Sequence, residues 1–260
     1  MKRNLIRAVL KAGWRIPLCY IAWMKRYANH PEKYPIDLKY RKLRKIVTQV
    51  TYGLDMDVIV SGKENIPNVT CAYFSNHIAA VDPLPIITTL ERPMAFLAKI
   101  ELEHTPIAST GIKDIDGLFL KRDDLKQSLR TMMKIEEELR SENKNWLIFP
   151  EGTRNKDDRA NLLEFHHGTF RPAMKAGVPI VPVAIFGTQR VFDKVSKFKK
   201  YPVHLTFLKP IMPEEYKDLS TQDVASLVQS RIQAELEYKS RKNDRAYLAT
   251  MLGNNFKENL

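Results

Sequence analysis

The chain has 260 residues, of which 44% are hydrophobic and 28% charged, which is enough apolar material for one large folded domain. Its formal net charge is +12, and residues 1–50 hold 13 Lys and Arg against only Glu32 and Asp37, so the rest of the chain is almost neutral. A neutral body argues against a protein that binds nucleic acid along its length. Two cysteines suit a reducing compartment, and no CxxC or HExxH spacing indicates a metal site.

Residues 1–52 are predicted to form a basic, amphipathic, helical arm for membrane association. The predicted second helix of this arm runs from an N-cap at Asp37 to Val50. Both helices fit two interpretations, packing helices with solvated basic faces or a surface that binds anionic lipid. Trp14 and Trp23 favour an anionic membrane surface, because tryptophan suits a boundary with one wet edge. The first helix carries a cation at every fourth residue: Arg3, Arg7, Lys11 and Arg15.

The apolar run at residues 16–24 contains a proline and is far shorter than the ~20 residues that a spanning helix needs. Lys25 and Arg26 follow this run without a small-residue cleavage site, which argues against a signal peptide. We therefore expect a protein attached to the cytoplasmic face of the cell membrane, in a monotopic or peripheral manner, that does not cross it.

Residues 53–260 alternate short β-branched or aromatic runs with helical stretches. This alternation predicts an α/β domain with a central mixed, partly parallel sheet flanked by helices. The predicted strands are 57–61, 69–74, 94–98, 118–120, 145–149, 179–186 and 203–208. The predicted helices are 83–90, 124–140, 169–176 and 221–237.

The glycines exclude several familiar enzyme classes. No two of the ten glycines lie within five residues of each other. The GxGxxG dinucleotide fingerprint, the Walker phosphate loop and the GxSxG nucleophile elbow all need closer pairs. The chain is therefore neither a nucleotide-loop enzyme nor an ordinary α/β-hydrolase.

A histidine and a carboxylate follow the second predicted strand, in the stretch NHIAAVDP. His77 would project from the carboxyl end of that strand, where α/β sheets bind ligands. If Asp82 folds back beneath the ring, it fixes the Nδ1–H tautomer and leaves Nε2 as a base. The alternative is a hydrogen-bonded structural histidine, with Asp82 as an ordinary N-cap before Pro83.

Three further segments lie on predicted strands or at their ends. FPEGTR, residues 149–154, combines a tight turn at Gly152 with a guanidinium at Arg154 that could bind a phosphate in two-pronged fashion. GLFLKR, residues 117–122, is a short strand that ends in two cations, and VPIVPVAI, residues 178–185, could form the wall of a pocket. Residues 149–154 alone also fit a surface turn with a charged pair, and each of these segments alone is a weak signal.

Taken together and in this order, these four segments resemble the conserved blocks of the glycerophospholipid acyltransferases, above all the lysophosphatidate acyltransferases. Asn76 and His77 with Asp82 match the NHx4D block of that family, and residues 117–122, 149–154 and 178–185 match the other three. The resemblance extends over roughly residues 55–210. One departure is His166, in the stretch EFHHG, where the family often carries a lysine.

The resemblance implies roles for particular residues. His77 would be the general base and Asp82 would orient it. Lys121, Arg122 and Arg154 would hold the phosphate of the acceptor, and Glu151 and Gly152 would shape the glycerol end of the site. The other predicted substrate-binding residues are Asn76, Gly117, Thr153 and His166.

The resemblance also implies the reaction, which is acyl transfer from acyl-CoA or acyl-carrier protein to the free hydroxyl of lysophosphatidate. It implies no metal and no cofactor. A different lysolipid acceptor is the nearest alternative. A non-catalytic lipid-binding relative and a nucleic-acid-binding protein are the alternatives from other classes, and the complete His77–Asp82 pair and the neutral body argue against them.

Overall fold

The computed structural model describes residues 18–121, 123–141, 144–155, 161–192, 200–237 and 242. Arg3, Arg7, Lys11, Arg15 and Trp14 of the predicted arm lie outside the described residues, and so does Arg122.

A seven-stranded sheet forms the centre of the fold, in the order β1-β7-β6-β2-β5-β3-β4. Neighbouring strands are parallel except β6 and β7, which are antiparallel. The predicted mixed, partly parallel sheet is thus confirmed. The strands are β1 (Met56–Ser61), β2 (Ala72–Ser75), β3 (Met94–Lys99), β4 (Leu118–Leu120), β5 (Asn145–Ile148), β6 (Ile180–Phe186) and β7 (Tyr201–Phe207).

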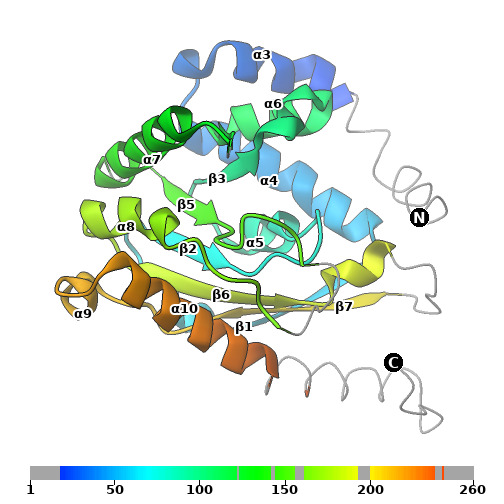
Figure 1. Ribbon diagram of the computed structural model, residues 1–260. Helices are drawn as coiled ribbons and strands as arrows, with labels where there is room; N and C mark the ends of the chain where they lie inside the picture. The colour runs from blue at the N-terminus through cyan, green and yellow to red at the C-terminus, as the bar shows by residue number, and fades with distance from the viewer. Residues whose placement is uncertain are drawn as a thin grey trace, which may run out of the picture.

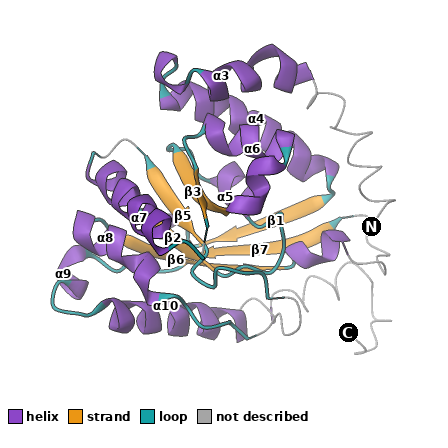
Figure 2. Ribbon diagram, turned by 45° about the horizontal axis from the view of Figure 1, so that its top comes forward, coloured by secondary structure: helices purple, strands orange, loops and turns teal. Residues whose placement is uncertain are grey.

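Helices cover both faces of the sheet, and each face has its own apolar core (Figures 1 and 2). One core lies under α4 (Ile36–Gly53) and α5 (Pro83–Thr89), with α6 (Pro106–Asp114) packed beside α4. The other core lies under α7, α8 and α10, and the short helix α9 completes this layer. The bounds are α7 (Leu125–Arg140), α8 (Arg171–Ala176), α9 (Pro213–Tyr216) and α10 (Thr221–Glu235).

The described part of the predicted arm packs against the domain. A π-helical turn (Tyr20–Met24) leads into α3 (Lys25–Asn29), and Met24 is buried in the core beneath α4. Trp23 is half-buried with its ring 5.3 Å from that of Tyr27, and Lys42 Nζ of α4 lies 5.6 Å from the Trp23 ring. This part of the chain therefore packs on the domain, and membrane association of residues 1–52 stays a prediction.

The start of α4 was predicted wrongly. The helix begins at Ile36 after Pro35, so Asp37 lies in the first turn and is not the N-cap. Pro35 holds an extended backbone just before the helix and makes no side-chain hydrogen bond to cap it. The backbone conformation of Pro35 therefore sets where the helix begins. The inward side of α4 carries buried Tyr40, Leu43, Ile46 and Val47.

Most predicted elements match the structure within three residues, and besides the short helix α3 two further helices were missed. β2 begins at Ala72 and not at residue 69, because ladder pairing starts where the Ala72 N–H meets Pro179 O. A 3₁₀ turn (His167–Phe170) replaces the predicted first turn of α8. The missed helices are α6, which begins with Pro106, and α9, which begins with Pro213.

The parallel strands bring the predicted motifs to one edge. β2, β5, β3, β4 and β6 all end there, and α/β sheets bind ligands at this carboxyl edge. Within the part of the chain that the structure describes, no helix combines the length and apolarity needed to cross a membrane.

Candidate active site

His77 lies just beyond the end of β2, with its side chain 19% exposed. Its ring stacks on Phe149, at 4.4 Å between ring centroids, and Phe149 directly follows β5. Its Nδ1 lies 2.7 Å from Asp82 Oδ2. A carboxylate can only accept, so Nδ1 carries the hydrogen and Nε2 keeps a free lone pair. The structure thus presents a partly exposed imidazole whose tautomer suits a base.

Asp82 is fully buried and is held by donors on both oxygens. Oδ2 accepts from His77 Nδ1 and also from the backbone N–H groups of Ile78 and Ala79, at 2.7 and 2.9 Å. The intervening four residues therefore wrap the carboxylate beneath the ring. Asp82 does precede α5, yet its side chain caps no N–H of that helix. The ordinary N-cap interpretation is therefore wrong, because the carboxylate faces backwards along the chain.

Thr188 completes the environment of Asp82 and was missed from the sequence. Its buried hydroxyl donates to Asp82 Oδ1, the oxygen that faces away from the histidine. The preceding Gly187 turns the chain after β6 at φ 102°, and a Cβ there would lie 2.2 Å from Pro202 O. Only glycine fits this turn. A glycine directly after the last apolar residue of a strand was therefore the sequence feature that indicated a turn at Thr188.

The FPEGTR segment, residues 149–154, and the residue after it hold the backbone of His77 in place. Glu151 is buried, and its Oε1 accepts from His77 N at 2.7 Å while Oε2 accepts from Leu163 N at 3.0 Å. Burial raises the pKa of the Glu151 carboxyl, and the two N–H donors act against that shift. Gly152 forms the turn at φ 65°, and Asn155 N donates to His77 O at 2.8 Å. One loop therefore bonds both the backbone N–H and the backbone C=O of His77.

Asn76 ties the end of β2 to the neighbouring strand. Its side-chain amide donates to Ile185 O and accepts from Ile185 N, at 2.9 and 2.8 Å, and the residue is buried. Both ends of the amide are thus used within the protein. Gly117, at the opposite end of β4 from Lys121, is required by packing, since a Cβ there would lie 2.7 Å from Ile112. Direct contact of Asn76 and Gly117 with substrate stays a prediction.

The predicted polar and cationic residues are exposed around the same edge. Lys121 directly follows β4, and Thr153 and Arg154 lie in the loop between Glu151 and Asn155. His166 is exposed, with its backbone N–H bonded to Pro150 O at 2.9 Å. The structure therefore joins His77, Asp82 and Glu151 through hydrogen bonds and ties Asn76 to Ile185, and it leaves Lys121, Arg154 and His166 exposed.

Comparison with known proteins agrees with this geometry. A family model described as "Acyltransferase" matches residues 57–186, which hold His77, Asp82 and the loop that clamps them. The chain belongs to the acyltransferase family. The predicted resemblance is thereby confirmed.

Named relatives and a solved structure point to one branch of these acyltransferases. A "Probable 1-acyl-sn-glycerol-3-phosphate acyltransferase" of Mycoplasma pneumoniae is 29% identical over 217 residues, which cover 78% of this chain and 80% of that protein. A 1-acyl-sn-glycerol-3-phosphate acyltransferase of Borreliella burgdorferi is 29% identical, over 69% of this chain and 72% of its own. The crystal structure of the 1-acyl-sn-glycerophosphate acyltransferase PlsC from Thermotoga maritima superimposes with a TM-score of 0.71, at 26% identity, over 90% of this chain and 95% of that one.

The chemistry open to this acyltransferase follows from its polar groups. An oriented imidazole with a free Nε2 can take a proton from an alcohol, and exposed cations can bind an anion beside it. Among the described residues, no group of three or more His, Cys, Asp or Glu side chains is arranged to hold a metal ion.

Proposed function

We propose that the protein transfers a fatty acyl group from an acyl thioester to the free hydroxyl of lysophosphatidate, which gives phosphatidate. The observation that carries this proposal is the His77–Asp82 pair, buried on the aspartate side and partly exposed on the histidine side, at the carboxyl edge of the sheet. The relatives named as 1-acyl-sn-glycerol-3-phosphate acyltransferases support the choice of acceptor.

In the proposed reaction, neutral His77 removes the proton of the acceptor hydroxyl through Nε2. The oxygen attacks the thioester carbonyl, the C–O bond forms, and the C–S bond breaks as the intermediate collapses. The proton on the imidazolium then passes to the departing thiolate. A thioester is already activated, so no acyl-enzyme is needed, and general-base catalysis by a positioned histidine contributes about 10²–10⁴-fold. Asp82 stabilises the imidazolium and keeps the ring oriented.

The acceptor phosphate is proposed to bind the exposed cations at the rim. Arg154 is adjacent to Asn155, whose N–H bonds His77 O, so the loop that carries the guanidinium is bonded to the backbone of the base. Lys121 comes from the end of β4, and Arg122 follows it in the sequence. Arginine can bind a phosphate through two parallel N–H donors, which orients the acceptor as well as holding it. His166 and Thr153 are further candidates for this rim.

The protein is proposed to work as a peripheral or monotopic protein on an anionic membrane surface at the cytoplasmic side. The support is the concentration of positive charge in residues 1–50 together with a lipid acceptor. Each Lys or Arg near an anionic surface contributes roughly 1 kcal/mol, so a few cations suffice for attachment.

One assay tests the proposed reaction. The purified protein in detergent is given a labelled acyl thioester and a set of acceptors that includes lysophosphatidate and monoacylglycerol, which lacks only the phosphate. We expect transfer to lysophosphatidate and little to monoacylglycerol. Preferred transfer to another lysolipid would replace the acceptor, and no transfer to any acceptor would contradict the proposed function.

A further inference from the structure

The outward side of α7 carries an unusual apolar stripe. Leu125, Leu129 and Met133 are 74%, 48% and 69% exposed, and they follow one another at intervals of four residues. Side chains at this spacing lie on one side of a helix. The opposite side of the helix is fixed in the core by Ile135 and Leu139. The stripe therefore faces solvent, and a row of large exposed apolar side chains is typical of a docking surface.

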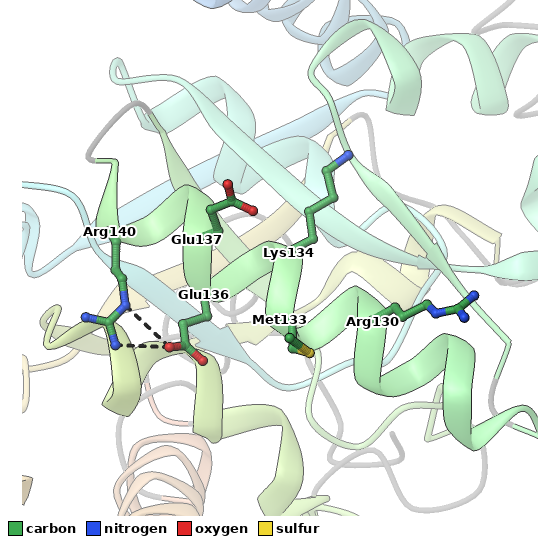
Figure 3. Close-up of a pocket in the computed structure, with 6 residues that line it drawn as sticks. All are labelled: Arg130, Met133, Lys134, Glu136, Glu137 and Arg140. Atoms are coloured by element: carbon green, nitrogen blue, oxygen red, sulfur yellow. Dashed lines mark hydrogen bonds and ion pairs between the residues drawn. The ribbon is translucent and has the colours of Figure 1, made fainter.

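A row of cations runs beside the stripe at the same spacing. Lys126, Arg130 and Lys134 are exposed and each follows a stripe residue directly in the sequence. None of the three forms an ion pair with another described residue. Residues 125–135 contain no acidic side chain, whereas Asp123 and Asp124 precede them and Glu136 follows them, paired with Arg140 at 3.0 Å. In Figure 3 the side chains of Arg130 and Lys134 extend away from the Glu136–Arg140 pair, and Glu137 points to the same side of the helix as Lys134.

A second copy of this chain does not suit the surface. A two-fold axis that crosses α7 near the middle of the stripe would set the helices of the two copies antiparallel. Arg130 and Lys134 lie on the same flank close to that middle, so the cations of the two copies would face each other. Like charges at such a distance are destabilising. The charge pattern instead requires an acidic partner.

A bilayer also suits the surface poorly. α7 packs on the core of one sheet face, whereas Met24 and α4 belong to the core of the other face (Figures 1 and 2). A flat membrane that meets the exposed cations Arg41 and Lys45 of α4 would lie on that other side of the molecule. The outward side of α7 then points away from that membrane and is open to a protein.

The position of α7 relates this surface to the reaction. The helix begins four residues after Lys121, at the carboxyl edge that holds His77. β2 and β4 are separated by β5 and β3, and three strand spacings amount to roughly 14 Å. We infer that α7 docks an acidic carrier protein that presents the acyl thioester on a flexible arm. This inference rests on the proposed function and adds the partner that delivers the donor.

Charge reversal tests the inference. The double variant Lys126→Glu/Arg130→Glu is compared with the control Lys209→Glu/Lys217→Glu, which reverses two exposed cations that follow β7 and α9. The donors are palmitoyl-acyl carrier protein and palmitoyl-CoA, with lysophosphatidate as acceptor. We expect kcat/KM for the carrier-protein donor to fall about tenfold or more in the α7 variant, and kcat/KM for palmitoyl-CoA to stay within about twofold. The control variant should behave as wild type with both donors.

A second variant tests the apolar stripe without changing charge. Leu129→Ser/Met133→Ser should weaken binding to immobilised acyl carrier protein and leave transfer from palmitoyl-CoA unchanged. Equal losses with both donors, or no loss with either, would overturn the docking surface while the acyltransferase function stands. Failure of the wild-type protein with both donors would instead refute the proposed function. Reduced sedimentation of the α7 variant with anionic vesicles would show that a membrane, and not a carrier protein, occupies the surface.

Discussion

The carboxylate of Glu151 accepts the backbone N–H of His77 at 2.7 Å, although the two residues are 74 positions apart in the chain. The same carboxylate accepts Leu163 N through its other oxygen. Glu151 thus connects the strand end that carries the histidine to the segment that follows the FPEGTR loop. Its buried position suits a residue that holds the base in place.

Glu151→Gln distinguishes this positioning role from contact with the glycerol of the acceptor. A glutamine amide can accept from only one of the two N–H groups, and its NH₂ would face the other, which costs about 1–3 kcal/mol. We expect kcat to fall about tenfold or more and the acceptor KM to change less than about twofold. The exposed neighbour Glu164→Gln is the control. A large rise in KM with kcat retained would place Glu151 against the substrate.

His77→Ala should remove the base while the fold persists, because the ring is partly exposed and stands at the end of a strand, outside the two apolar cores. We expect kcat to fall by about 10²-fold or more, with an unchanged circular dichroism spectrum. Asp82→Asn should also lower kcat strongly. The assignment fails if His77→Ala keeps more than about a tenth of the wild-type kcat.

Thr188→Val should impair catalysis through Asp82. The variant leaves Asp82 Oδ1 without its hydroxyl donor, so the carboxylate and the imidazole lose part of their orientation. We expect a severalfold lower kcat, an unchanged acceptor KM and a shift of the acidic limb of the pH–rate profile. Thr188→Ser retains the hydroxyl and should restore both the rate and the profile. If serine and valine behave alike, the methyl group matters and the hydrogen bond does not.

Asp114 should make stability depend on pH. Burial raises the pKa of this carboxyl to about 8, against the attraction of the Lys39 ammonium. In the unfolded chain the carboxyl titrates near about pH 4, so the folded state binds the extra proton between these values. The contribution of Asp114 to the free energy of unfolding is therefore full below about pH 4, and it is lost as the pH rises toward about 8. The difference in melting temperature between wild type and Asp114→Asn should follow this course, whereas exposed Asp218→Asn should show none.

The N-terminal region should attach the protein to anionic lipid through its charge. Met24 is buried, so a truncation should stop at residue 17 and spare the core. We expect the protein without residues 1–17 to sediment less with anionic vesicles and to keep its activity on a short-chain, water-soluble acceptor. High salt should weaken binding of the intact protein, because attraction to surface charge is screened within roughly 8 Å at physiological ionic strength. Equal binding of both proteins to anionic and neutral vesicles would contradict the prediction.

The sequence predicted the elements that depend on local patterns. Alternating apolar runs located the strands, and the spacing of His77 and Asp82 predicted their contact, since a short loop brings the two side chains together. The antiparallel β6–β7 pair was not predictable, because local patterns do not show that the last strand lies between β1 and β6. Gly187 indicated a turn at Thr188, yet the sequence could not show that this turn meets Asp82, 106 positions away.

The Trp23 prediction shows the limit of reading side chains by type. An aromatic residue among cations fits a membrane boundary, and it fits equally well a Lys42 ammonium above its ring, which is what the structure contains. Residue composition could not separate these two environments, because both offer tryptophan one apolar and one charged neighbour.

The polar groups around His77 come from distant parts of the chain, and this determines when the enzyme can become active during synthesis. The imidazole comes from β2, its peptide clamp from the loop after β5, and the hydroxyl behind Asp82 from the turn after β6. β2 lies between β5 and β6 in the sheet, so both neighbours must pair with it before the polar groups meet. Such non-local pairing forms late and slowly. A nascent chain that has not yet reached Thr188 has the histidine but no assembled base, so it cannot act on lipid before the sheet is complete.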